Sequence, residues 1–278
     1  MMKSSLNAWS CPADHDFETV FRSLKAAGFA GVELNVDSED NPSAHSLTIH
    51  TTAEELAAIR ALSEKYELPV VSISSGQYAG GRTFGEGTQA GRDRARLIME
   101  TQIRCAEALG ADGVLIVPGG IGEEVSIMQA WNNSQESLAS MKDVITGTSV
   151  KVGVENVWNG FFMSPMEMAR FIDELNIRNL GAYFDVGNVA IFSMPEYWIE
   201  VLGSRIVKIH VKDFRKTGGN AGHFVNMLEG TIRWDKVVAA LRKIGFDGYL
   251  TAELAAMPAT PDYLYRITRD ALDEIIAM

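Results

Sequence analysis

The chain has 278 residues, of which 46% are hydrophobic, and it carries a formal net charge of -11. That hydrophobic fraction suits a sizeable core and argues against global disorder, while the acidic balance disfavours a general nucleic-acid surface. No linker, low-complexity tract or break in composition divides the sequence. We therefore expect a single domain spanning residues 1–278.

Cysteine usage and the N-terminal sequence indicate the compartment. Only two cysteines occur, Cys11 and Cys105, which are too few for a disulfide scaffold and too far apart for a close metal-binding pair. The first 18 residues lack the long apolar stretch of a signal peptide, because Asp14 and Asp16 interrupt them. No run reaches the roughly 18 apolar residues of a membrane span. We expect a cytoplasmic protein with neither a membrane nor a nucleic acid as its partner.

Predicted strands and helices alternate along the chain. Short apolar runs typical of buried strands lie at residues 6–9, 31–35, 70–74, 113–117, 152–155, 182–185, 206–211 and 249–253. Amphipathic segments typical of helices lie between them, at residues 17–27, 51–66, 92–109, 165–175 and 234–244. In the first of these segments, Phe17, Val20, Phe21 and Leu24 repeat at the spacing i, i+3, i+4, i+7, which predicts one apolar helix face.

Three of the predicted helices end in the same way. Gly28, Gly110 and Gly245 each follow a helix and precede a short turn and a strand. Glycine adopts the left-handed conformation that ends a helix at little steric cost, so one helix-to-strand connection is predicted at least three times. Two glycine-rich stretches, residues 76–87 and 215–222, predict mobile loops that follow strands.

Eight strands alternating with about eight helices predict an α/β fold, a (β/α)₈ TIM barrel. A doubly wound sheet is the alternative. Two observations favour the barrel: no glycine-rich phosphate loop of the GxGxxG type follows the first strand, and residues suited to ligand binding end several different strands. In TIM barrels, the active site lies at the carboxyl ends of the strands.

The last four predicted strands each end on a residue that can bind a metal: Glu155, Asp185, His210 and Glu253. Alone, each has a simpler interpretation as a helix cap, a surface group or a hydrogen-bonded core residue. Together they stand at one height on neighbouring strands about 4.8 Å apart, and a cation would relieve the repulsion among three carboxylates. This donor set suits a divalent ion such as Mn²⁺, Co²⁺ or Mg²⁺, with Zn²⁺ as a further candidate.

These residues lie in motifs that resemble the xylose isomerase-like, metal-dependent barrels. Similarity to sugar and sugar-phosphate 3-epimerases and isomerases, among them ketose 3-epimerases and L-xylulose 5-phosphate 3-epimerases, is found in the stretches ENVWNGFFMSPMEMARFIDE, AYFDVGNV, IVKIHVKDF and LEGTIRWDKVVAALRKIGFDGYLTAEL. The resemblance covers most of the chain and is strongest over residues 151–254. It implies an isomerase in carbohydrate metabolism that exchanges a proton through a metal-bound enediolate, with ketose 3-epimerisation preferred. It also implies a homo-oligomer, either a dimer or a tetramer.

The resemblance implies a role for each of the four residues. Glu155 would be both a metal ligand and a catalytic acid/base. Asp185 and His210 would be metal ligands. Glu253 would be the fourth ligand and the acid/base on the opposite side of the substrate. One divalent ion, with Mn²⁺ preferred, would be the cofactor.

Two positions depart from the ketose 3-epimerase pattern. Those enzymes usually place a histidine three residues after the aspartate of the sixth strand and an arginine six residues after the histidine of the seventh. This chain has Asn188 and Lys216 at these positions, the latter next to Arg215. Both changes concern substrate contacts rather than the metal, so phosphorylated substrates gain weight beside free ketoses.

A basic cluster follows the histidine of the seventh strand. Lys212, Arg215 and Lys216 could hold the phosphate of a substrate in a chain that is otherwise acidic. A solvated face with Asp213 as the partner explains the cluster equally well. Arg82 is a second candidate for binding an anion.

Two tryptophans are candidate walls for a sugar. Trp9 is predicted at the end of the first strand, and Trp158 lies just past Glu155. Each is explained equally well as a packed aromatic residue.

Three other functions compete with the epimerase hypothesis. A dehydratase of inosose or dehydroshikimate type would use the same barrel and metal site but would expel a hydroxyl group. A DNA-repair endonuclease of the same superfamily needs three zinc ions and more histidines than the five in this chain. A non-catalytic sugar-binding protein would need no acid/base pair such as Glu155 and Glu253.

Overall fold

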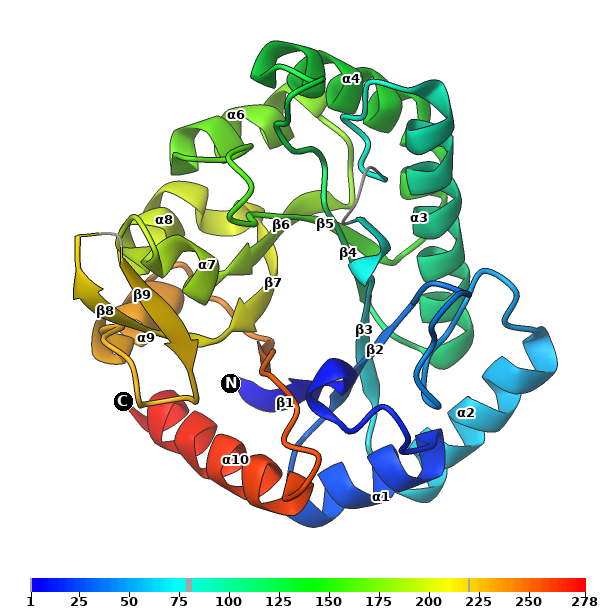
Figure 1. The fold of residues 1–278 in the computed structure, drawn as a ribbon, viewed down its shortest axis with the longest axis vertical. Helices are drawn as coiled ribbons and strands as arrows, with labels where there is room; N and C mark the ends of the chain where they lie inside the picture. Colours follow the sequence, from blue (N-terminus) through cyan, green and yellow to red (C-terminus); the bar gives the residue numbers. More distant parts are fainter. Residues whose placement is uncertain (1, 79–81, 220) are drawn as a thin grey trace.

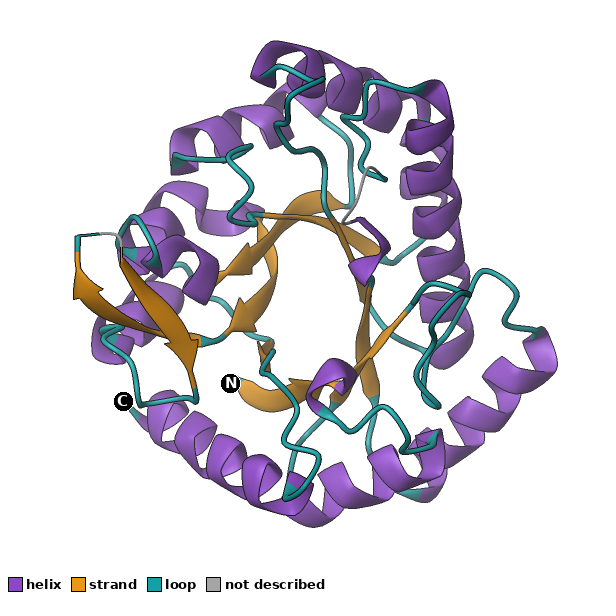
Figure 2. Cartoon of the chain, in the orientation of Figure 1, coloured by secondary structure: helices purple, strands orange, loops and turns teal. Residues whose placement is uncertain are grey.

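In the computed structural model, which describes residues 2–78, 82–219 and 221–278, eight parallel strands form a closed barrel. Their order around the barrel is β1-β10-β7-β6-β5-β4-β3-β2, so the last barrel strand closes on the first. Figure 2 shows the strands as an inner ring and most helices as a layer outside it. The predicted TIM barrel is confirmed, and the doubly wound alternative is wrong because the sheet closes on itself.

The elements alternate as the sequence predicts (Figure 1). The barrel strands are β1 (Lys3–Asn7), β2 (Val32–Asn35), β3 (Val70–Ser74), β4 (Gly113–Ile116), β5 (Lys151–Glu155), β6 (Leu180–Asp185), β7 (Ile206–Val211) and β10 (Tyr249–Ala252). The helices are α1 (Phe17–Ala27), α2 (Ala53–Lys65), α3 (Gln89–Leu109), α4 (Ile127–Ser140), α5 (Lys142–Gly147), α6 (Pro165–Leu175), α7 (Val186–Ala190), α8 (Pro195–Leu202), α9 (Trp234–Lys243) and α10 (Pro261–Ala277). Short 3₁₀ helices are η1 (Ala8–Ser10), η2 (Gly76–Tyr78) and η3 (Gly203–Arg205).

The first strand ends earlier than the sequence predicts. The side chain of Asn7 accepts a hydrogen bond of 2.8 Å from the backbone N–H of Trp9, which starts η1 at Ala8. Trp9 therefore lies in a helical turn after β1, and its predicted place in the strand is wrong. At the other end of the chain, Glu253 lies one residue past β10, but its N–H still bonds to the carbonyl of Val211 at 3.1 Å.

Glycines end the helices as predicted. Gly28, Gly110 and Gly245 have φ values of +90°, +77° and +72°, the left-handed region that a glycine adopts without strain. Such a cap turns the chain from the helix back into the next strand, and it holds these three connections in one geometry.

The two glycine-rich stretches differ from their predictions. In the second stretch, residues 215–218 and 221–222 belong to an antiparallel hairpin of β8 (Asp213–Gly218) and β9 (Ala221–Val225), in which Phe214 pairs with Phe224, and position 220 lies outside the described residues. The prediction of a loop is therefore wrong there. The stretch at residues 76–87 begins with η2, and its residues 79–81 lie outside the described residues. The hairpin stands outside the barrel, beside β7, at the left of the view in Figure 1.

The core occupies the barrel and the layer between strands and helices. Polar side chains are also buried on the barrel strands, among them Asn7, Glu33, Ser72, Asp185 and His210. Buried polar groups require hydrogen bonds or ions, so these residues direct attention to the barrel interior. Among the helices of the described residues, none is long and apolar enough to cross a membrane.

Candidate metal centre

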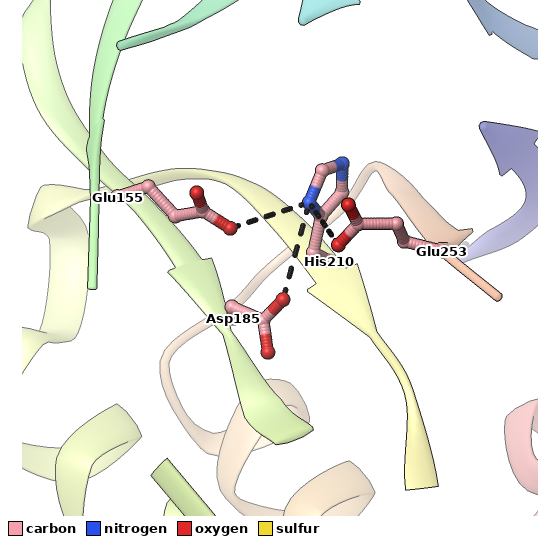
Figure 3. Close-up of side chains that lie close together, drawn as sticks. All are labelled: Glu155, Asp185, His210 and Glu253. Atoms are coloured by element: carbon pink, nitrogen blue, oxygen red, sulfur yellow. Dashed lines mark ion pairs between the residues drawn. The ribbon is translucent and has the colours of Figure 1, made fainter. Parts of the chain in front are cut away.

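Four side chains from the last four barrel strands converge at one end of the barrel (Figure 3). Glu155 and Asp185 are the final residues of β5 and β6, His210 is the second-last residue of β7, and Glu253 follows β10. One potential ligand atom from each residue lies within 4.8 Å of the others. The strand register accounts for part of this closeness, since Asp185 pairs with His210 across β6 and β7. The four residues named from the sequence thus lie together.

The imidazole of His210 lies at the middle of the cluster. Its Nδ1 is 3.5 Å from Oε1 of Glu155, 3.6 Å from Oε2 of Glu253 and 4.0 Å from Oδ2 of Asp185. These separations exceed ordinary hydrogen-bond lengths. Within the described part of the chain, the buried Nδ1 of His210 has no hydrogen-bond partner, and Oδ2 of Asp185 has none beyond its ion pair with Nζ of Lys212 at 3.1 Å. A divalent cation would satisfy both atoms, so the donor set fits a metal ion.

The carboxylates in the cluster are costly to ionise. Burial raises the pKa of Glu155 to about 7, and the charges of Asp185 and Glu253 contribute to the rise. Burial also raises the pKa of Asp185, although Lys212 opposes that shift. Both shifts reflect negative charges placed close together away from water. A bound cation would lower this cost, and metal binding would therefore compete with protons.

A fourth carboxylate, the fully buried Glu33 on β2, supports the cluster from within the barrel. Its Oε1 accepts hydrogen bonds from Nδ2 of Asn7 at 2.6 Å and from Nε2 of His210 at 2.5 Å. Its Oε2 accepts bonds from the hydroxyl groups of Ser72, at 2.6 Å, and Tyr183. Burial alone would raise the pKa of Glu33, but His210 and the two hydroxyl groups lower it to about 2.

The contact with Glu33 sets the orientation of His210. Because Nε2 donates to Glu33, Nδ1 faces the three carboxylates of the cluster. A carboxylate that holds the second nitrogen of a metal-binding histidine fixes both the ring and its tautomer. Glu33 is not among the residues predicted from the sequence. The available signal is a glutamate between Val32 and Leu34 in an apolar strand, since a buried charge requires a partner.

Lys212 contacts the cluster directly. Its Nζ lies 2.5 Å from Oε2 of Glu253 and 3.1 Å from Oδ2 of Asp185. Burial lowers the pKa of Lys212, but the negative charges of Asp185 and Glu253 raise it by more, so the net shift is upward. Lys212 therefore balances charge beside the candidate metal ligands.

Asn188 lies in α7, which follows directly after the end of β6 in the sequence. Its backbone N–H donates to Oδ1 of Asp185 at 2.7 Å, and its Nδ2 donates to the carbonyl of Asn156 at 3.1 Å. Its side-chain oxygen is buried and has no hydrogen-bond partner within the described residues. Asp185 thus caps α7, and the bond from the N–H of Asn188 orients its carboxylate. The contact between Asn188 and a substrate stays a prediction.

The other two members of the basic cluster lie apart from Lys212. Nε and Nη2 of Arg215 donate to the carbonyl of Glu229, and Arg215 is exposed on the hairpin. Lys216 lines a separate cavity of about 200 Å³ with Ser193 and Thr231. Asp213, the alternative partner for the cluster, is buried and accepts from Nε1 of Trp234 at 3.0 Å. The three cations therefore do not form one site.

Cavities flank Trp9 at the same end of the barrel. One, of about 580 Å³, contacts Glu253 and Lys212, and we call it the mouth cavity. A second, of about 440 Å³, is lined by Arg82 and Asp37, and Trp9 lines both cavities. Trp158 is 66% exposed and does not line the mouth cavity as the described residues define it. Of the two predicted tryptophan walls, Trp9 is the one beside a cavity.

Curated relatives of this chain include epimerase-like proteins. It is 26% identical over 235 residues to the putative L-ribulose-5-phosphate 3-epimerase SgbU of Escherichia coli, covering 83% of this chain and 80% of SgbU. It is also 26% identical over 159 residues to the uncharacterized protein MJ1311 of Methanocaldococcus jannaschii. That match covers 54% of this chain, and the chain spans 53% of MJ1311.

Solved structures share the fold at low sequence identity. The 3-keto-D-glucoside 4-epimerase YcjR from E. coli, in its apo form, superposes with a TM-score of 0.79 at 16% identity over 100% of both chains. A D-tagatose 3-epimerase-like protein has a TM-score of 0.78 at 18% identity, with 99% of this chain and 98% of that one covered. The IOLI protein with a bound zinc atom has a TM-score of 0.79 at 15% identity, with 99% and 98% covered.

The sequence also matches a family description over nearly its whole length. Residues 21–275 match the xylose isomerase-like TIM barrel family, which agrees with the barrel, with the motifs at the ends of β5 to β7 and β10, and with the structural neighbours. The chain therefore belongs to the xylose isomerase-like TIM barrel family.

Proposed function

We propose that this protein is a divalent-metal-dependent sugar isomerase that exchanges a proton next to a carbonyl group, with ketose 3-epimerisation as its preferred reaction. The observation that supports it most is the convergence of four potential ligand atoms within 4.8 Å, with the buried Nδ1 of His210 left without a hydrogen bond among the described residues. The names of SgbU and YcjR, which describe epimerases, agree with this proposal.

Glu155, Asp185, His210 and Glu253 would hold the ion, and Mn²⁺ suits three carboxylates and one imidazole. When bound, the ion would polarise the substrate carbonyl and stabilise the negative charge that develops on its oxygen. Glu33 would keep His210 in the orientation that this requires. Lys212 would hold the carboxylate of Glu253 in place.

Glu155 and Glu253 are placed to act from two sides of a substrate. The barrel order puts β6 and β7 between β5 and β10, so the two glutamates do not come from neighbouring strands. One carboxylate takes the proton from C3, leaving an enediolate, and the other returns a proton to the opposite face of C3, which inverts that carbon. The ammonium group of Lys212, 2.5 Å from Oε2 of Glu253, favours the ionised form of that carboxylate and hence Glu253 as the base. Glu155, on the other side of the site, would return the proton.

A dehydratase remains the second candidate, and the placement of Glu155 and Glu253 on strands that are not neighbours is the observation that favours it. One carboxylate would take a proton while the other protonates a departing hydroxyl group. The two reactions differ in their products, because the epimerase retains all oxygen atoms of the sugar and the dehydratase releases water.

Proton exchange in D₂O tests the proposal. The protein, loaded with Mn²⁺, is incubated with a panel of ketoses and ketose phosphates and followed by NMR. Deuterium at C3 together with the C3 epimer is the expected result. Loss of water would identify the dehydratase instead. Deuterium exchange between C1 and C2 with formation of an aldose would identify an aldose–ketose isomerase.

Substitution of the two glutamates tests the residues. Glu155→Gln and Glu253→Gln should each lower turnover by about 10²- to 10⁴-fold, since each removes one acid/base group. Glu136→Gln, on the exposed surface of α4, is the matched control and should keep full turnover. Full turnover in both site variants would show that the mechanism is wrong.

A further inference from the structure

The mouth cavity touches the candidate metal centre through Glu253. Its lining includes Trp9 from η1, Lys212 after β7, Phe224 from β9, and Asn226 and Glu229 after β9. A substrate that reacts between Glu155 and Glu253 would extend its remaining carbons into this space of about 580 Å³. The chemistry of the lining therefore bears on which substrates the centre accepts.

The charges on the cavity wall disfavour an anion. Two of its lining residues are carboxylates, Glu229 and Glu253, and the lysine in the lining, Lys212, pairs with Glu253 and Asp185. With a divalent ion bound, the three carboxylates of the centre would still carry one negative charge more than the ion, and that charge balances Lys212. A phosphate monoester carries a charge of about -1.5 to -2 at pH 7. Placing it beside carboxylates without a free cation is strongly unfavourable.

Arg215 and Lys216, which the sequence suggests as phosphate contacts, do not line the mouth cavity. On the β8–β9 hairpin, Arg215 pairs with His223, while Phe214 pairs with Phe224. Since neighbouring residues of a strand face opposite sides, Arg215 lies on the face away from Phe224 and the cavity. Lys216 lines a different cavity. The residues outside the described ranges, at positions 1, 79–81 and 220, include no lysine or arginine.

Two aromatic rings provide an apolar wall instead. Nε1 of Trp9 donates to Oδ1 of Asp37 at 3.0 Å, and the ring packs against Gly76, where an added Cβ would lie 3.0 Å from Cζ2 of Trp9. The indole is thus fixed in place. Phe224 on the hairpin is the second aromatic residue of the lining. Rigid aromatic faces suit the C–H face of an uncharged sugar, with Asn226 available for a hydroxyl group.

Arg82, the second anion candidate from the sequence, also lies near Trp9. It lines the second cavity, and Trp9 is the wall that the two cavities share. The carboxylate of Asp37 lines that second cavity too, which offsets the charge of Arg82. Arg82 does not line the mouth cavity as the described residues define it.

From these observations we infer that the substrate is an uncharged sugar, and that the mouth cavity selects against its phosphorylated counterpart. This inference rests on the proposed function, because it concerns the substrate of the same centre. It runs against the phosphate named for SgbU and against the weight that the basic cluster gives to phosphorylated substrates in the sequence.

Matched pairs of substrates test the inference. The Mn²⁺-loaded protein is assayed for C3 exchange with L-ribulose against L-ribulose 5-phosphate, and with D-fructose against D-fructose 6-phosphate. We expect kcat/KM for the free ketose to exceed that for the phosphate by about 100-fold or more in the pair that reacts. A preference for the phosphorylated member would overturn the inference while the proposed function stands. If Arg82→Ala then removed that preference, it would identify Arg82 as the phosphate contact.

A charge reversal on the cavity wall provides a second test. Glu229→Lys should raise the ratio of kcat/KM for the ketose phosphate to that for the free ketose about tenfold. Glu136→Lys makes the same change of net charge on α4, away from the cavity, and should alter neither substrate. Equal effects of the two variants would contradict the inference.

Binding separates this inference from the proposed function. If no ketose is exchanged, the proposed function fails, and the melting temperature of the Mn²⁺-loaded protein then decides the inference by itself. A rise with the free ketose and none with its phosphate supports an uncharged ligand. A larger rise with the phosphate overturns it.

Discussion

Glu33 and Glu155 are both buried glutamates on barrel strands, yet their surroundings shift their pKa values in opposite directions. Glu33 has a pKa of about 2 and accepts four hydrogen bonds from the side chains around it. Glu155 has a pKa of about 7, and the basic side chain beside it is His210, whose Nδ1 lies 3.5 Å from Oε1 of Glu155. Burial acts on both residues, so the number of donors around each carboxylate decides the direction.

This difference distinguishes a structural carboxylate from a reactive one. The ionised form of Glu33 is already satisfied by protein groups, and it can serve only to hold its neighbours. The carboxylate of Glu155 lacks such donors and stands beside Asp185 and Glu253. Its carboxylate can therefore bind a cation or take part in proton transfer. The barrel thus uses two glutamates for different roles: Glu33 as rigid support and Glu155 as part of the open site.

The largest effect is expected from weakening the structural carboxylate. Glu33→Gln replaces an acceptor of four hydrogen bonds by an amide whose NH₂ group faces donors. We expect the free energy of unfolding to fall by about 3 kcal/mol, because buried donors lose their partner. Urea unfolding in the presence of EDTA measures this change. A loss no larger than that of Glu136→Gln would remove the distinction between the two glutamates.

The same substitution should also weaken metal binding, although Glu33 is not one of the four candidate ligands. A neutral amide oxygen accepts from Nε2 more weakly than a carboxylate and holds the ring of His210 less firmly, so we expect the affinity for Mn²⁺ to fall by about 10- to 100-fold. Tyr183→Phe is the matched control: it removes one hydrogen bond to Glu33 but keeps the bond between Glu33 and His210, and the ring of residue 183 still packs edge-on against the imidazole. Titration calorimetry should find a much smaller loss of affinity in that variant. Equal losses would show that general destabilisation is the cause.

The contribution of Glu155 to the stability of the folded protein should change with pH in the opposite direction to that of a salt-bridged acid. The folded protein keeps the proton of Glu155 up to about pH 7, whereas the unfolded chain releases it near the ordinary value of 4.5. Stability from this group is therefore complete below pH 4.5 and is lost as the pH rises to about 7.

Glu155→Gln tests this sign, because the variant cannot titrate. In EDTA, the wild type should lose about 3 kcal/mol relative to Glu155→Gln between pH 4.5 and pH 7.5, so the variant should be the more stable protein at the higher pH. Urea unfolding at several pH values gives the two curves. Parallel curves would mean that Glu155 is not shifted.

The sequence predicted the reactive half of this comparison because its signals are local. Each of Glu155, Asp185, His210 and Glu253 ends an apolar run, and parallel strands bring their carboxyl ends to one edge. The glycine caps at Gly28 and the two related positions are confirmed for the same reason. The apolar run around Trp9 misled the strand prediction, since the cap from Asn7 ends β1 early.

The structural half could not be predicted in the same way. Glu33 meets His210 across 177 residues of chain, and only closure of the barrel brings β2 near β7. No local pattern states which strands face each other across the interior. The hairpin of β8 and β9 was missed because much of it is exposed, so alternating apolar residues do not mark it. The separation of Lys212 from Arg215 and Lys216 follows from that hairpin.

The smallest expected effect concerns Lys212, which stands between the two kinds of environment. Its ammonium group bridges Asp185 and Glu253, so Lys212→Met should lower the stability of the protein in EDTA by about 1 kcal/mol. With saturating Mn²⁺ the loss should be smaller, because the cation balances the same carboxylates, and the rise in melting temperature on adding Mn²⁺ should therefore exceed that of the wild type. Lys216→Met, which lies off the mouth cavity, should change neither value. An equal loss with and without Mn²⁺ would mean that Lys212 acts through packing over the ring of Phe224, 5.5 Å away, and not through its charge.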